Sequence, residues 1–226
     1  MDLKAHYKKL FDRSVQNILN NKYVLDPEID SNNDNRYGIT LLIRPSEKVK
    51  KQIQRFLSAL KEVDNSQYYY PNTDIHITVL SIISCQTGFS LNQINTEEYL
   101  TVIEENLDSI ANLEIHCKGI TASDSAVMIQ GFPSDESLNS FRDSLRKAFS
   151  KTNLKQSIDS RYTLLTAHST VCRFRAPIEN TAELIAVLEK YKHYDFGTFQ
   201  VNTLDLVYND WYQRAEKTQI IHQFKI

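Results

Sequence analysis

The stretches IHITV at residues 75–79 and AHSTV at residues 167–171 follow one pattern in the two halves of the chain. Each places a histidine two residues before a threonine among apolar residues. Side chains alternate between the two faces of a β-strand, so residues i and i+2 point the same way. Each stretch therefore predicts one imidazole and one hydroxyl on a single strand face. If the two strands lie side by side, they form a site with two acid/base groups and two neutral donors, which suits an anionic phosphoryl group.

Composition limits the kind of protein that can carry such a site. The chain has 226 residues and 41% hydrophobic content, enough for a sizeable core and at most two ordinary domains. Its 26 basic and 28 acidic residues give a net charge of −2, with no run of five or six like charges. We therefore expect a small ligand, a nucleotide or an RNA end, rather than a long nucleic acid duplex. We also expect a monomer.

The cysteines and the apolar segments indicate the compartment. Cys85, Cys117 and Cys172 are odd in number and form no C-x-x-C pair, which argues against a disulfide framework and a structural zinc site. The N-terminus mixes charged and apolar residues, unlike a signal peptide, and no stretch approaches the ~18 apolar residues of a membrane span. These features predict a cytoplasmic protein that makes no membrane contact.

Hydrophobic spacing predicts an amphipathic helix at about residues 5–21, whose apolar stripe we expect to pack on its own lobe. The turn-forming stretch 30–35 follows it. We therefore divide the chain into an N-terminal helical arm, residues 1–35, and a single bilobal domain, residues 36–226.

Within residues 36–226 the order strand, helix, motif strand, helix, strand occurs twice. The expected strands are about 37–43, 74–83, 113–121, 126–132 and 164–174, with helices at about 47–63, 96–110, 134–151 and 181–191, and closing strands at about 197–209 and 218–226. The repeat is one of order, without matching identities. It predicts two lobes related by a pseudo-twofold axis, each an α+β unit with helices outside its sheet, and the two motifs facing each other across a central groove.

The H-x-[ST]-h tetrapeptides at residues 76–79 and 168–171 resemble those of the 2H phosphoesterase superfamily, which includes the enzymes named 2′-5′ RNA ligases and 2′,3′-cyclic phosphodiesterases. One such tetrapeptide recurs by chance in many proteins, whereas two in matching contexts are specific. The resemblance spans about residues 37–226. It implies a bilobal α+β fold with two antiparallel sheets around a groove, and metal-independent chemistry on phosphodiesters that have a neighbouring ribose hydroxyl.

The chemistry of the four motif side chains leads to the same reaction class. Opening a 2′,3′-cyclic phosphate needs a base for the attacking water and an acid for the departing ribose oxygen, and His76 and His168 can fill both roles near neutral pH. Thr78 and Thr170 can donate to the non-bridging oxygens. We predict a phosphodiesterase that hydrolyses a 2′,3′-cyclic phosphate or a 2′-5′ linkage of a nucleotide or short RNA end. Which histidine is the acid is left open.

The alternative is a catalytically idle module that binds a nucleotide or an RNA end in a regulatory role. A binder needs donors but has no need for a matched acid and base, so the presence of both histidines and both threonines disfavours it. Turnover of a 2′,3′-cyclic mononucleotide in the presence of EDTA separates the two.

Aromatic residues in loops near the motif strands are candidate contacts for a base, which are worth ~1–3 kcal/mol each. They are Tyr70, Tyr162, Trp211 and Tyr212. Loop aromatics also commonly cover the edge of a core, and the sequence does not separate these roles.

We expect no metal and no cofactor, because a zinc site needs three protein ligands and only Cys172 offers a third beside the motif histidines. Arg173 and Arg175 differ from His168 by odd numbers, so in a regular strand they point away from the groove, and only a bulge would reverse this.

Overall fold

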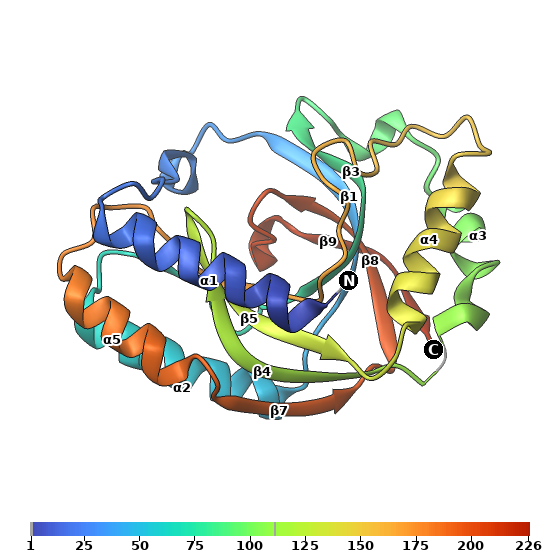
Figure 1. The fold of residues 1–226 in the computed structure, drawn as a ribbon. Coiled ribbons are helices and arrows are strands. Elements are labelled where there is room, and N and C mark those ends of the chain that lie inside the picture. Colours follow the sequence, from blue (N-terminus) through green and yellow to red (C-terminus); the bar gives the residue numbers. More distant parts are fainter. Residues whose placement is uncertain (1, 111) are drawn as a thin grey trace.

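The computed structural model describes residues 2–110 and 112–226 and contains two antiparallel sheets (Figure 1). The four-stranded sheet, sheet A, has the order β3-β1-β8-β9 and is formed by β1 (Arg36–Ile43), β3 (Ile77–Thr87), β8 (Thr203–Asp210) and β9 (Gln219–Lys225). The five-stranded sheet, sheet B, has the order β2-β6-β5-β4-β7 and is formed by β2 (Tyr68–Tyr69), β4 (Glu114–Ala122), β5 (Ala126–Pro133), β6 (Ser169–Arg173) and β7 (Asp195–Gln200). The predicted α+β class with two antiparallel sheets is confirmed.

The long helices form for local reasons that are visible in the sequence. In α2 (Glu47–Val63) the Ser46 side chain accepts a hydrogen bond from the Val49 amide at 3.4 Å and caps the first turn. Its apolar residues recur at helical spacing and are buried. The predicted helix 47–63 has the same bounds.

The two lobes are interleaved along the chain, which the order of elements alone does not show. Helix α2 follows β1 of sheet A but packs against β7 and β6 of sheet B. Conversely, α4 (Ser137–Phe149) follows β5 of sheet B but contacts β3 of sheet A. Helix α3 (Thr96–Glu104) packs beside α4, and α5 (Thr181–Tyr191) packs beside α2 (Figure 1). Each repeat therefore supplies structure to both lobes.

Helix α1 (Leu3–Leu19) packs on the same face of sheet B that carries the second motif. Thr121 pairs with Met128, and Met128 pairs with Thr170, so these three side chains share one face. The Thr121 hydroxyl donates to the Tyr7 carbonyl at 2.9 Å, and Tyr7 and Phe11 are buried. Most of the apolar stripe of this helix is thus covered by its own chain, although Leu19 at its end is 53% exposed.

The segment after α1 is tied to the rest of the fold by main-chain hydrogen bonds. The Val24 amide donates to the Asp124 carbonyl at 2.6 Å, and the Asp26 amide donates to the Phe174 carbonyl at 2.7 Å. These bonds fasten the segment to the hairpin of sheet B and to the end of β6. The domain boundary at residue 36 stays a prediction.

Four expected elements differ from the structure. The expected closing strand 197–209 is two strands, β7 and β8, because the chain pairs with β4 up to Gln200 and then with β1 from Thr203. Both motif strands begin later than predicted, so that each histidine immediately precedes its strand. The helix expected at 96–110 ends at Glu104 and is followed by a 3-10 turn, Leu107–Ile110. The other 3-10 turns are Pro27–Asp30, Leu91–Gln93 and Ala215–Lys217.

Among the described residues, none of the helices has the length and apolar character needed to cross a membrane.

Candidate active site

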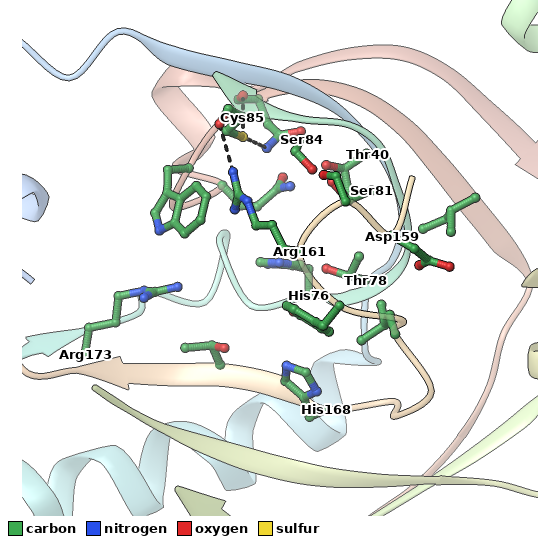
Figure 2. Close-up of a pocket in the computed structure, with 18 of the residues that line it drawn as sticks. Thr40, His76, Thr78, Ser81, Ser84, Cys85, Asp159, Arg161, His168 and Arg173 are labelled. Carbon is green, nitrogen blue, oxygen red and sulfur yellow. Dashed lines mark hydrogen bonds between the residues drawn. The ribbon is translucent and has the colours of Figure 1, made fainter. Parts of the chain in front are cut away.

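The four motif side chains come together in one cavity. His76, Thr78, His168 and Thr170 all line a space of about 190 Å³ between the two sheets, which has room for a small ligand rather than a single water. Figure 2 shows His76 and Thr78 above His168, with the space between them. The structure thus places the predicted pair of imidazoles in a single site.

The first motif is held by its own main chain. His76 immediately precedes β3, and its Nδ1 lies 2.7 Å from the carbonyl oxygen of Asp74. Because a carbonyl only accepts, Nδ1 carries a proton. In the neutral ring Nε2 is then the unprotonated nitrogen, which can accept a proton.

The second motif is held by a side chain. His168 immediately precedes β6, and its Nδ1 lies 2.7 Å from the hydroxyl oxygen of Thr166. A hydroxyl can donate or accept, so it can serve either tautomer of the ring and the protonated ring. The residue between them, Ala167, crosses β5 closely: a Cβ at Gly131 would lie 1.9 Å from the Ala167 carbonyl oxygen. Only glycine allows this approach.

Both histidines are held in their neutral form. Burial lowers the pKa of His76 to about 4, and nearby Arg44 and Arg173 act in the same direction. Burial also lowers the pKa of His168 to about 4, followed by the charge of Arg142 and smaller contributions from other cations. A bound anionic phosphoryl group favours the protonated form of a nearby imidazole. The arrangement therefore suits a site in which the ligand itself raises the pKa of the acid.

A β-bulge follows the threonine of each motif. On β3, Thr78 pairs with Leu42 and Leu80 pairs with Leu41, which leaves Val79 as the extra residue. On β6 the extra residue is Val171, between the partners of Met128 and Val127. An extra residue reverses the alternation of faces beyond it.

The bulge brings Arg173 into the cavity, which corrects its expected position on the opposite face. Its Nε donates to the Tyr70 hydroxyl at 2.9 Å, and its Nη1 lies 3.4 Å from Asp26. The guanidinium is thereby oriented where it can contact a phosphoryl oxygen. Arg175 points away as expected but for another reason, because it lies beyond the end of β6, where it binds Asp30 and the Ser66 carbonyl.

Only some of the candidate aromatic residues line the cavity. Tyr70, Tyr162 and Trp211 line the cavity, but Tyr70 is buried and Tyr162 is 65% exposed. Tyr212 does not line it: its ring is buried and its hydroxyl donates to Asp26 at 2.8 Å.

Arg161, which lies outside both motifs, covers Trp211 with its guanidinium carbon 4.1 Å from the ring centre. It also donates to the Cys85 carbonyl at 3.0 Å, at the end of the cavity away from His168 (Figure 2). The signal in the sequence was a basic residue beside an aromatic one, Arg161-Tyr162, in the loop before the second motif.

Within residues 2–110 and 112–226, no group of three or more His, Cys, Asp or Glu side chains could hold a metal ion. Cys172, the only third ligand that the sequence offered, is buried away from the cavity because the bulge turns Arg173 inward instead.

Comparison with known proteins agrees with this geometry. The family described as AKAP7 2'5' RNA ligase-like domain matches residues 39–219, which include both motifs and most of both sheets. The chain belongs to this family. AKAP7 2'5' RNA ligase-like domains are part of the 2H phosphoesterase superfamily, so the resemblance of the two tetrapeptides is confirmed. No curated protein matches the sequence as a relative.

Solved structures show how the fold of this AKAP7 2'5' RNA ligase-like domain is shared. TT0787 of Thermus thermophilus aligns with 83% of this chain and 97% of its own at a TM-score of 0.59 and 13% identity. Escherichia coli LigT complexed with 3'-AMP aligns with 84% of this chain and 98% of its own at a TM-score of 0.53 and 9% identity. A conserved Agrobacterium tumefaciens protein of unknown function, ATU0111, covers 94% of this chain and 97% of its own at a TM-score of 0.54 and 11% identity. At such identities the likeness concerns the fold.

Proposed function

We propose that this protein is a metal-independent phosphodiesterase that opens a 2′,3′-cyclic phosphate, or cleaves a 2′-5′ linkage, in a nucleotide or short RNA end. The observation that carries the proposal is the meeting of His76 and His168 in one cavity with two threonine hydroxyls and the Arg173 guanidinium. A ligand with a phosphoryl group between the imidazoles would meet donors and a cation on its non-bridging oxygens.

In the proposed reaction one neutral imidazole takes a proton from the attacking water as the water oxygen bonds to phosphorus. The other imidazole, protonated in the complex, gives its proton to the ribose oxygen as the phosphorus–oxygen bond breaks. Thr78 and Thr170 donate to the non-bridging oxygens, where negative charge increases in the transition state. The product is a phosphomonoester beside a free ribose hydroxyl, and proton exchange with solvent restores the pair.

The pKa values of the two histidines in the unliganded protein determine how kcat/KM depends on pH. Because both pKa values lie near 4 in the unliganded protein, kcat/KM should be bell-shaped with an optimum below pH 6.5. In the substrate complex the phosphate anion raises the pKa of the acid, so the optimum for kcat should lie at higher pH. Coincident optima for kcat and kcat/KM would contradict this use of the substrate charge.

The decisive experiment is turnover of a 2′,3′-cyclic mononucleotide by the purified protein in the presence of EDTA. We expect hydrolysis that is unaffected by the chelator. Tight nucleotide binding without turnover of any cyclic or 2′-5′-linked compound would support the alternative, an idle binding module.

The substrate is best identified with a panel of cyclic mononucleotides, 2′-5′ oligoadenylates, cyclic dinucleotides and ADP-ribose cyclic phosphate. Escherichia coli LigT was solved with 3'-AMP, a nucleotide with a phosphate on its ribose, which supports beginning with mononucleotides. We further propose a reducing, cytoplasmic location, which the free thiols of Cys85, Cys117 and Cys172 suit.

A further inference from the structure

A fully buried arginine on α4 links the two motifs from behind. Arg142 is 0% exposed. Its guanidinium donates to the carbonyl oxygens of Thr78 at 2.9 Å, Val79 at 2.8 Å and Thr166 at 2.9 Å. Two of these carbonyls belong to the first motif and its bulge, and the third belongs to the residue whose hydroxyl holds His168. One side chain thus contacts both motif segments.

This arginine is an unusual side chain to bury. Among the described residues, no carboxylate forms an ion pair with it, and burial lowers its pKa to about 10. Removing an unpaired cation from water is costly, and its hydrogen bonds to carbonyl dipoles offset only part of the cost. An apolar residue at the same position on the buried stripe of α4, beside Phe141 and Leu145, would avoid that cost but would take this donor away from the three carbonyl oxygens. The guanidinium is therefore matched to the main chain of the two motif segments.

We propose that Arg142 is a positioning residue that holds the two motif segments in register across the lobes and supplies a fixed positive charge behind the reacting phosphoryl group. The inference rests on the proposed function and names a further residue that it needs. Thr78 and Thr166 are fixed relative to each other by one planar guanidinium, so the first hydroxyl and the second imidazole keep their spacing. The same charge is the largest cationic influence on His168.

Three variants separate charge from geometry. Arg142→Met removes both, Arg142→Lys keeps the charge but cannot reach all three carbonyls, and Lys147→Met removes a charge from the exposed side of the same helix as a matched control. The measurements are the NMR titration of His168 in the free protein, the thermal midpoint, and kcat and KM for 2′,3′-cyclic AMP.

We expect the pKa of His168 to rise by about one pH unit in Arg142→Met, because a like charge has been removed, and to stay low in Arg142→Lys. In both variants kcat should fall at least about tenfold with a smaller change in KM, because Arg142 does not touch the substrate. Lys147→Met should change neither the titration nor kcat.

An unchanged His168 titration in folded Arg142→Met would overturn the electrostatic role, and wild-type kcat in folded Arg142→Lys would overturn the positioning role. If Arg142→Met does not fold, Arg142→Lys still decides through kcat. The titration requires no turnover, so it tests Arg142 even if the wild-type protein hydrolyses none of the proposed substrates. Absence of wild-type turnover, with the titration shifted, would reject the proposed function and not the influence of Arg142 on His168.

Discussion

The two motifs share one sequence pattern, but different groups hold their histidines in place. His76 is held by the carbonyl of Asp74 in its own segment and leads into β3, an eleven-residue strand. His168 leads into β6, a five-residue strand, and is held by the hydroxyl of Thr166. The segment before β6 also depends on Gly131 for space. Each histidine is held by the residue two positions before it, but the second motif also needs the close approach of β5 at Gly131, so its geometry is the more easily disturbed.

The largest expected effect is the loss of kcat/KM when either motif histidine is removed. His76→Ala and His168→Ala should each reduce kcat/KM about 10²–10⁴-fold, since each removes one partner of the acid/base pair. Thr78→Ala and Thr170→Ala should have smaller effects, because a hydroxyl donor is not consumed in the reaction. The measurement is steady-state hydrolysis of a 2′,3′-cyclic mononucleotide. A histidine variant with the wild-type rate on the best substrate would remove that residue from the mechanism.

Two glycines test whether the second motif is more dependent on distant structure. A Cβ at Gly131 would meet the Ala167 carbonyl oxygen at 1.9 Å, and a Cβ at Gly38 would meet the Ile83 carbonyl oxygen at 2.3 Å. Both glycine-to-alanine variants should lose about 1–3 kcal/mol of unfolding free energy from overpacking, measured by urea denaturation.

Only Gly131→Ala should also lower kcat under conditions where both variants are folded, because only Ala167 adjoins a motif histidine. Equal loss of kcat in Gly38→Ala would show that the two motifs are equally sensitive to distant packing.

The Thr166 hydroxyl gives a sharper test with a smaller effect. Thr166→Val keeps the shape but removes the partner of His168 Nδ1, so kcat/KM should fall about tenfold, the cost of one hydrogen bond to a buried group. Thr166→Ser should restore the rate. Asp74→Asn is the matched control in the first motif, because its contact with His76 is through the main chain. Loss of activity in Thr166→Ser despite correct folding would point to the methyl group and against the hydrogen bond.

The last expected effect is on stability rather than on rate. The pKa of each histidine is about 4 in the folded protein against 6.5 for an ordinary imidazole, so the unfolded chain binds more protons between those values. The two histidines therefore contribute stability that is complete above pH 6.5 and is lost as the pH falls toward 4. Urea denaturation of the wild type and of the double alanine variant across this window should show a shallower slope for the variant. Parallel pH dependence would mean that the histidines are not held neutral.

The sequence predicted the elements whose signals are local. The motif side chains share a cavity because a histidine and the threonine two residues later still point the same way. This holds although each strand begins just after its histidine, later than predicted. Helix 47–63 follows from the Ser46 cap and the apolar spacing. The division of 197–209 into β7 and β8 does not follow, because only the partners β4 and β1 decide where one sheet ends and the other begins.

The parts of the site that were missed depend on distant contacts. Arg173 points into the cavity because of the bulge at Val171, and the local sequence does not distinguish a bulged strand from a regular one. Arg142 left a readable signal, since it occupies an apolar-stripe position four residues after Leu138 and three before Leu145. An arginine on the buried side of a helix indicates that its guanidinium has buried hydrogen-bond partners. Which carbonyls it contacts could be known only from the fold.

The central claim is that two motifs from interleaved lobes act as one acid/base site, and a double-mutant cycle tests it most directly. We would measure kcat of the wild type, His76→Ala, His168→Ala and the double variant in the presence of EDTA on one cyclic mononucleotide. Because the two groups act in a single step, the double variant should be about as slow as the slower single variant. If the losses of the two single variants multiply in the double variant, the histidines act independently and the account of a shared site is wrong.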